Sequence, residues 1–136
     1  MSAKAKNIIY WVTTAIMGFV MLSGGAGDLM KPAALVAGMT LLGYPYYFMT
    51  ILGTWKVLGG ITILAPGYPR LKEWAYAGIF FDVSGALASH AFSSDYGATG
   101  FHIWVNALLA IVTLLSWYYR PQSRVVGEIC KPKMAA

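Results

Sequence analysis

Residues 46–65 read YYFMTILGTWKVLGGITILA, an apolar run that contains a single charge, at Lys56. A helix of about 20 apolar residues is long enough to cross the ~30 Å hydrocarbon core of a bilayer. Directly after the run, the sequence PGYP at residues 66–69 cannot continue a helix, and it leads into the charged segment RLKE at residues 70–73. The stretch therefore predicts a transmembrane helix that ends in a short polar turn.

The rest of the chain has the same character. Of its 136 residues, 58% are hydrophobic and 11% are charged, against roughly 25% charged residues in an ordinary soluble domain. The three longest stretches without Lys, Arg, Asp or Glu are residues 7–27, 32–55 and 96–119. The aromatic content of 15% excludes a disordered chain, and the single cysteine, Cys130, excludes an intrachain disulfide. A chain with this composition has too few charged residues for a water-facing surface, so we expect a lipid bilayer as its partner.

Turn-forming residues divide the apolar sequence into four long segments. We therefore expect an all-α integral membrane protein, a single membrane domain over residues 1–136, in which four transmembrane helices form an antiparallel bundle. The expected spans are about residues 8–26, 46–65, 74–92 and 101–119.

A shorter apolar stretch, about residues 32–43, follows the first span. It is too short to cross the bilayer, has a proline at its start and ends at the sequence GYP. We expect one short interfacial or re-entrant helix here, with Asp28 and Lys31 holding its entry at headgroup level. The alternative is a continuous extension of the second span, and Pro45 argues against it.

The basic residues set the expected orientation. One predicted side of the membrane holds most of them: Lys4, Lys6, Arg70, Lys72, Arg120, Arg124, Lys131 and Lys133. The other side holds Lys31 alone. By the positive-inside rule, both termini of this multi-pass protein, including the basic tail at residues 120–136, face the cytoplasm. Since these cations flank membrane spans and no nucleic-acid-reading module accompanies them, we expect no nucleic-acid partner.

Two charged residues fall inside the predicted spans. Lys56 lies about 14 Å, and Asp82 about 12 Å, from the cytoplasmic ends of their antiparallel helices, at ~1.5 Å per residue. Each charge alone would cost about 2.5 to 3.5 kcal/mol at the bilayer centre, so we expect the two to form an intramembrane polar pair. Such a pair either fixes the register of two helices or lines a polar cavity that handles a proton, an ion or a headgroup.

Further polar residues lie toward the predicted outer side. His90 follows the aspartate of the pair by two helical turns, on nearly the same face. His102 opens the fourth span, and Asn106 lies one turn deeper. Asp28 and Asp95 are the outer-side candidates. Together these side chains predict a polar path that opens outward, with the intramembrane pair at its base.

The path has three candidate uses. A quinone or another amphiphile could bind between helices, with its ring against Trp55, Phe80 or Phe81 and its oxygens on the first histidine or the intramembrane lysine. His90 and His102 could ligate a haem, or a metal together with a carboxylate, but no short ligand spacing marks such a site, so neither haem nor metal is expected. The third use is structural, with histidines that cap helix ends.

Small residues in two spans predict a close helix contact. They are Gly53, Gly59 and Gly60 in the second span, and Gly78 and Gly85 in the third. We expect them to pack these two spans against each other within one chain. A homo-oligomer built on the same residues is a less favoured alternative.

One set of motifs carries a resemblance to a known family. The motifs are Gly43-Tyr44-Pro45, Gly53 with Lys56, Pro66, the run LKEWAYAG at residues 71–78, Gly85-Ala86, Ser89-His90 and Asp95. The chain resembles the DoxX-like family of small four-helix bacterial membrane proteins, although Ser94 stands where such sequences tend to have glycine. The resemblance singles out as candidate functional residues Lys56, Glu73, Trp74, Tyr76, Asp82, Ser89, His90 and Asp95.

The resemblance implies a role beside membrane redox enzymes, because the family takes its name from a small subunit associated with quinol- and thiosulfate-oxidising systems. We therefore expect an accessory subunit in a bacterial inner membrane that binds a quinone-like amphiphile and has redox-complex subunits as partners. No catalytic nucleophile arrangement, phosphate-binding glycine loop or metalloprotease motif occurs, so no independent catalytic activity is expected. The alternatives are a small proton-coupled carrier or channel and a structural or assembly factor.

Overall fold

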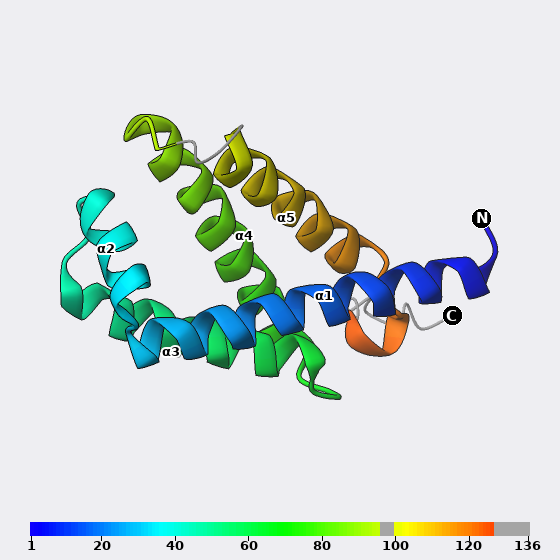
Figure 1. Ribbon diagram of the computed structural model, residues 1–136. Coiled ribbons are helices and arrows are strands. Elements are labelled where there is room, and N and C mark those ends of the chain that lie inside the picture. Colours follow the sequence, from blue (N-terminus) through cyan, green and yellow to red (C-terminus); the bar gives the residue numbers. More distant parts are fainter. Residues whose placement is uncertain (96–99, 127–136) are drawn as a thin grey trace, which may run out of the picture.

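The computed structural model describes residues 1–95 and 100–126. Within these ranges all regular structure is helical, which confirms the predicted all-α class (Figure 1). The elements are α1 (Ala3–Met30), α2 (Ala33–Leu41), α3 (Tyr46–Leu64), α4 (Pro69–Phe92), α5 (Phe101–Tyr118) and the 3₁₀ turn η2 (Gln122–Arg124). The short helix expected after the first span is α2. Cys130, Lys131 and Lys133 lie outside the described residues.

Glycine and proline set the helix boundaries. Gly43 has a φ of +84°, a conformation that other residues rarely adopt, and Pro45 directly precedes α3. Pro69 occupies the first turn of α4, where its missing N–H costs nothing. α1 continues past the expected end of the first span at residue 26, so Asp28 lies within the helix.

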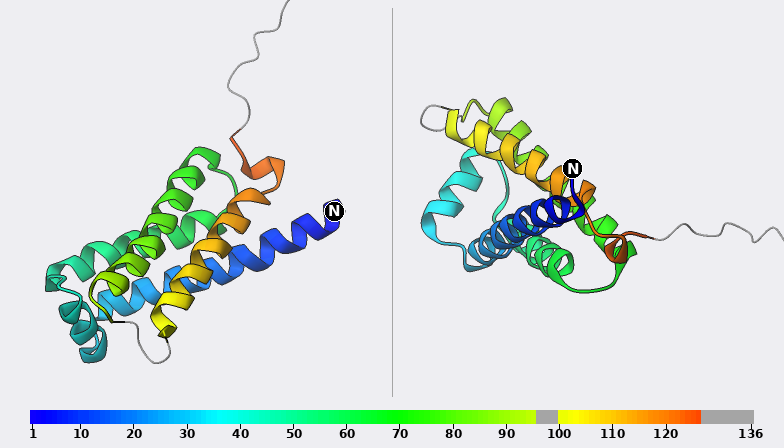
Figure 2. Two further views of the ribbon diagram at one scale, coloured as in Figure 1. Left: turned by 90° about the horizontal axis from the view of Figure 1, so that it is seen from above. Right: turned by 90° about the vertical axis from the view of Figure 1, so that its right-hand side faces the viewer.

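The long helices form two pairs. α1 packs along α3 and α4 packs along α5, while contacts of α1 with α5 and of α3 with α4 join the pairs (Figures 1 and 2). Figure 1 shows α4 and α5 running obliquely away from α1 and α3 toward the end of the molecule where α2 lies. The pairs are therefore close near the α3–α4 turn and diverge toward α2.

The packed core lies where α1, α3 and α4 meet. Its buried side chains are Met17, Met21, Ile63, Tyr76, Ile79 and Val83. Other large apolar side chains are exposed, among them Trp55, Trp74 and Phe92. Continuous exposed apolar surface is costly in water, whereas a helix surrounded by lipid tails requires it.

Three helices, α1, α3 and α5, are long and apolar enough to cross a membrane. α4 is not among them, although it is 24 residues long. Its first turns hold Arg70, Lys72 and Glu73, and Asp82 and His90 follow, so its hydropathy is lower. The fourth crossing in the expected bundle thus stays a prediction.

Polar contacts close the bundle near the α3–α4 turn. The Lys72 Nζ donates to the carbonyl oxygens of Thr62 and Ala65, at the end of α3, where carbonyls have no partner within the helix. Burial, with the nearby charges of Arg124 and Arg120, lowers the pKa of Lys72 to about 8. Lys72, which the sequence analysis counted as a loop cation, is therefore a buried cap of α3.

Candidate functional site

Lys56 on α3 lies between two aspartates from neighbouring helices. Its Nζ donates a hydrogen bond to Oδ2 of Asp28 on α1 at 3.0 Å and lies 3.9 Å from Oδ2 of Asp82 on α4. All three side chains are mostly buried, and that of Asp28 is only 8% exposed. We call Asp28, Lys56 and Asp82 the lysine cluster. The structure thus brings together the two residues of the expected pair and adds a third, closer one.

Asp28 reaches this cluster because α1 and α3 pack backbone to backbone. A Cβ on Gly53 would lie only 2.8 Å from the carbonyl oxygen of Gly25 and 3.0 Å from Cβ of Asp28. Asp28 is therefore level with Gly53, about 10 Å from the start of α3 at ~1.5 Å per residue. It lies inside the bundle, as part of α1 and in contact with Lys56, whereas the sequence analysis assigned it to the entry of the short helix. Its expected companion there, Lys31, instead lies over the ring of Tyr46, 4.1 Å from the centroid.

The lysine cluster holds one ammonium and two carboxylates. When all three groups are ionised, one negative charge is left without a counterion in the cluster. A surplus charge is expensive in a low-dielectric interior. The cluster can therefore take up a proton or hold a positively polarised group, and its ammonium can donate to a ligand oxygen.

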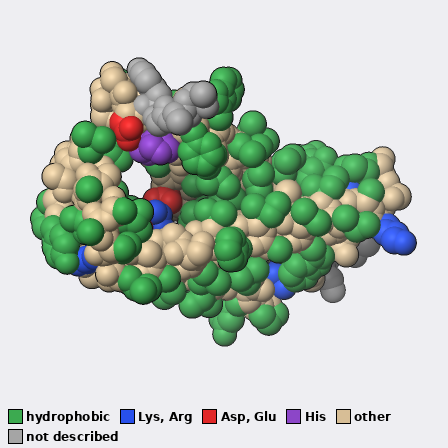
Figure 3. All heavy atoms as spheres, viewed as in Figure 1, with side chains coloured by type: hydrophobic (Ala, Val, Ile, Leu, Met, Phe, Trp, Pro, Cys, Tyr) green, Lys and Arg blue, Asp and Glu red, His purple; other side chains and the backbone are tan. Residues whose placement is uncertain are grey.

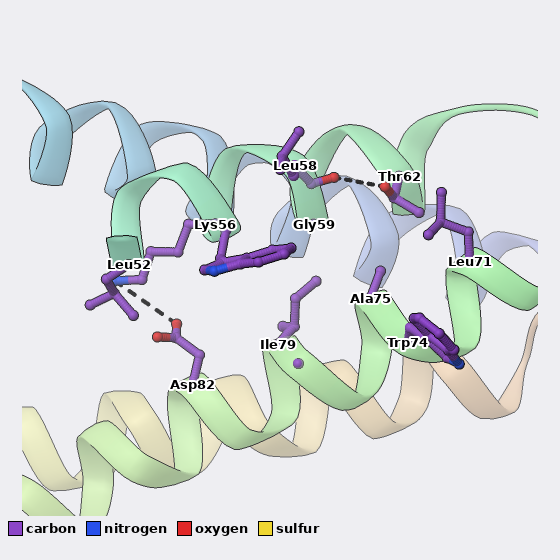
Figure 4. A pocket seen from close by; sticks show the side chains of 12 residues that line it. Leu52, Lys56, Leu58, Gly59, Thr62, Leu71, Trp74, Ala75, Ile79 and Asp82 are labelled. Atoms are coloured by element: carbon purple, nitrogen blue, oxygen red, sulfur yellow. Dashed lines mark hydrogen bonds and ion pairs between the residues drawn. The ribbon is translucent and has the colours of Figure 1, made fainter. Parts of the chain in front are cut away.

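A groove between α3 and α4 opens beside this cluster, and we call it the α3–α4 groove (Figure 4). Its volume is about 520 Å³. Figure 4 shows Lys56 and Asp82 facing each other at one end, Trp74 at the other, and Ile79 between them. Trp55 also lines the groove. One end is thus charged, while aromatic and aliphatic side chains form the remainder.

Phe80 and Phe81, which the sequence analysis offered as partners for a ligand ring, lie elsewhere. They line a second, smaller cavity of about 320 Å³ together with Trp117 of α5. Trp55 therefore shares a groove with the lysine cluster, whereas the two phenylalanines do not.

A second polar cluster lies where α4 ends and α5 begins. The Nδ1 of His90 lies 3.1 Å, and the Nδ1 of His102 lies 3.4 Å, from Oδ2 of Asp95. We call these three residues the histidine cluster. Figure 3 shows an opening between a histidine side chain, in purple, and blue and red charged side chains deeper in the molecule. No residue of the histidine cluster lines the α3–α4 groove, so the two clusters do not share that groove.

Two further predicted residues make structural contacts. The hydroxyls of Ser89 and Tyr44 are 2.6 Å apart, which ties the α2–α3 connection to α4. The Asn106 side chain donates from Nδ2 to the carbonyl oxygen of His102, one turn earlier in α5. Neither side chain lines the α3–α4 groove.

Glu73, from the family motif, joins α4 to the end of α5. Its Oε2 accepts from Nε1 of Trp117 at 2.8 Å, and its Oε1 accepts from Nη2 of Arg120 at 2.6 Å. Partial burial raises the pKa of Glu73, but the hydrogen bonds from Trp117 and Arg120 more than offset this and hold the pKa below its usual value. Glu73 therefore acts as an ionised clamp between two helices.

Tyr76, also from the motif, belongs to a buried hydroxyl cluster. Its OH and the Thr14 hydroxyl each lie 2.7 Å from Oγ of Ser116, so the cluster joins α4, α1 and α5. The sequence analysis did not identify Thr14 or Ser116, because single hydroxyl residues in apolar spans carry no distinguishing pattern. These contacts support the bundle and lie apart from the α3–α4 groove.

Comparison with known proteins identifies one family. The model of the DoxX-like family matches residues 12–115, which is well over half of the chain. The match includes both clusters and the α3–α4 groove. No curated protein and no solved structure matches the chain.

Proposed function

Because the chain belongs to the DoxX-like family of membrane proteins, we propose that it binds a quinone-like amphiphile in the α3–α4 groove as an accessory subunit of a membrane redox system. The observation that carries this proposal is a groove of about 520 Å³ with an ion pair at one end and apolar walls along the rest. Ligand sites typically have volumes of ~300–1,000 Å³, apolar linings and a few polar groups that orient the ligand.

The proposed pose follows from the lining. The Lys56 ammonium donates to a quinone oxygen, and the ring packs against Trp55 or Trp74, whose side chains are exposed in the bare protein. An isoprenoid tail leaves the groove along the apolar surface of α3 and α4. The residues of this site hold and orient the ligand, while electron transfer belongs to partner subunits.

We further propose that α4 crosses the membrane and completes four spans. Its 24 residues measure about 36 Å at ~1.5 Å per residue, more than the ~30 Å hydrocarbon core. Arg124, near the C-terminus, donates to the hydroxyl of Tyr10 in α1 and to the carbonyl oxygen of Leu64 at the end of α3. These contacts gather both terminal segments and the α3–α4 turn at one end, as an even number of crossings requires. From the basic residues at that end we infer, by the positive-inside rule, that it faces the cytoplasm and that the membrane is a bacterial inner membrane.

The test measures the masses of the small molecules and partner chains that stay bound after gentle extraction of the protein from its own membrane. Native mass spectrometry of wild type is expected to show a bound quinone and a redox-subunit partner chain. Lys56→Met should reduce the bound quinone at least tenfold, whereas Lys31→Met, the same change outside the groove, should not.

The single variant leaves Asp28 buried without its cation, which destabilises proteins by about 3–5 kcal/mol. The double variant Asp28→Asn with Lys56→Met removes both charges and keeps the test valid if the single variant unfolds. A wild-type protein that retains only lipid, or a double variant that retains quinone fully, would overturn the binding proposal. A quinone mass without any partner chain would overturn the accessory role alone.

The surplus carboxylate of the lysine cluster favours a second candidate, a proton-coupled carrier. Two carboxylates around one ammonium can bind and release a proton as a solute passes. In proteoliposomes with an internal pH dye and an imposed potential, this candidate predicts a proton flux that Asp82→Asn abolishes. Absence of flux in the wild type would exclude it. Failure of both tests would leave a structural or assembly role.

A further inference from the structure

Three potential metal ligands converge where α4 gives way to α5. One atom from each of His90, Asp95 and His102 lies within 4.8 Å of the other two. His90 belongs to the last turn of α4, His102 to the first turn of α5, and Asp95 to the chain that leaves α4. These are the only two histidines in the sequence. The fold thus brings both imidazoles to one carboxylate.

Hydrogen bonding alone leaves this cluster incomplete. His90 Nδ1 lies 3.1 Å from both Oδ2 and the backbone carbonyl oxygen of Asp95 and can donate to either. The Nδ1 of His102 is buried, lies 3.4 Å from the same oxygen and has no hydrogen-bond partner among the described residues. A buried polar atom without a partner carries a desolvation cost, and an ion bound in the cluster is one explanation for it.

The distances from the two histidines to Asp95 are close to those between ligand atoms around one ion. A tetrahedral zinc ion with bonds of about 2.0–2.1 Å keeps neighbouring ligand atoms about 3.3 Å apart. The two nitrogen-to-oxygen distances, 3.1 Å and 3.4 Å, lie on either side of that value. Two imidazole nitrogens with one carboxylate oxygen are a donor set that suits Zn²⁺ and other divalent transition metals.

We propose that His90, Asp95 and His102 bind one divalent transition-metal ion, with Zn²⁺ as the best-suited ion. The ion gives the Nδ1 of His102 the partner that it lacks, and it ties the end of α4 to the start of α5. Three protein ligands leave a fourth position for water or an external group. The site is distinct from the α3–α4 groove, whose lining includes none of these residues. Loss of the proposed quinone binding would therefore leave this proposal intact.

The test uses Zn²⁺ and Co²⁺ with purified, tag-free full-length protein in detergent. Equilibrium dialysis is expected to give one Zn²⁺ per chain, and Co²⁺ should give the visible absorption of a low-symmetry site. His90→Ala, His102→Ala and Asp95→Asn should each weaken Zn²⁺ binding at least tenfold. Glu73→Gln, which removes a carboxylate elsewhere in α4, should bind as wild type does.

Thermal unfolding separates metal binding from a purely structural role. Zn²⁺ should raise the melting temperature of wild type and of Glu73→Gln, because a ligand bound to the folded state stabilises it. It should not raise that of the double variant His90→Ala with His102→Ala, whatever the melting temperature of that variant without metal. A wild type without stoichiometric Zn²⁺, or an equal rise in the double variant, would overturn the proposal.

Discussion

At Lys56, one ammonium holds two carboxylates from different helices, and the nearer one is Asp28 at 3.0 Å. Comparison of depths along two antiparallel helices predicted a partner for this lysine in Asp82. The same comparison missed Asp28, because the first span was expected to end at residue 26, whereas α1 continues to Met30. The sequence signal that was available was simple. Asp28 is an acidic residue at the end of an otherwise uncharged span, and a lysine side chain is long enough to reach it.

At Glu73, the structure predicts a loss of stability in acid. Hydrogen bonds from Trp117 and Arg120 outweigh the effect of burial and hold the folded-state pKa of Glu73 below the ordinary 4.5. A lowered carboxyl pKa stabilises the fold fully above pH 4.5, and this contribution is lost as pH falls through the folded-state value. We expect the melting temperature in detergent to decrease between neutral pH and a pH below 4.5. The decrease should be larger for wild type than for Glu73→Gln.

The quantity to compare is the acid-induced decrease in melting temperature, and not the melting temperature itself. At neutral pH the variant should already melt a few degrees below wild type, because it has lost the charged partner of Arg120. Identical acid sensitivity in the two proteins would show that the Glu73 clamp contributes nothing to stability.

Among the helices, the close contact lies between α1 and α3. The sequence analysis expected the glycines of the second and third spans to pack α3 against α4. For Gly53 and Gly60 this was wrong. A Cβ on either would meet α1, whereas a Cβ on Gly59 would meet Ile79 of α4 at 3.6 Å, as expected. A Cβ on Gly78 or Gly85 of α4 would meet nothing within 4 Å. Small residues predict that a close contact exists, but they do not identify which neighbouring helix makes it.

The close contact between α1 and α3 predicts different changes in stability for two glycine-to-alanine substitutions. Gly53→Ala places its Cβ 2.8 Å from the Gly25 carbonyl oxygen, so the helices must separate at a cost of about 1–3 kcal/mol. Gly78→Ala meets open space and should be neutral or gain up to ~1 kcal/mol of helix propensity. Thermal unfolding in detergent measures both. Equal melting temperatures would contradict the backbone contact between α1 and α3.

For the whole molecule, the number of crossings depends on α4. α1, α3 and α5 have the length and composition of membrane spans. α4 is long enough as well, but its hydropathy is lower. Packing against α3, α5 and the lysine cluster supplies α4 with partners for its polar side chains, which lipid alone would not. A helix of this kind can cross a membrane inside a bundle although its hydropathy does not mark it.

Cysteine labelling tests this topology directly. In a Cys130→Ser background, we expect Ser94→Cys to react with an impermeant maleimide on intact cells. Tyr68→Cys and Ser2→Cys should react only after the membrane is opened. Labelling of positions 68 and 94 from the same side would mean that α4 does not cross.

The sequence by itself determined the membrane class, the all-helical structure, the approximate bounds of the helices and the family. These follow from local properties, since hydropathy, helix-breaking residues and short motifs act within about one span. Only the tertiary structure decided that Asp28 faces Lys56, that Gly53 packs on α1 and that His102 meets Asp95. Each of these depends on how a helix is rotated about its axis. Rotation is set by the packing of side chains far apart in the chain, and no local pattern records it.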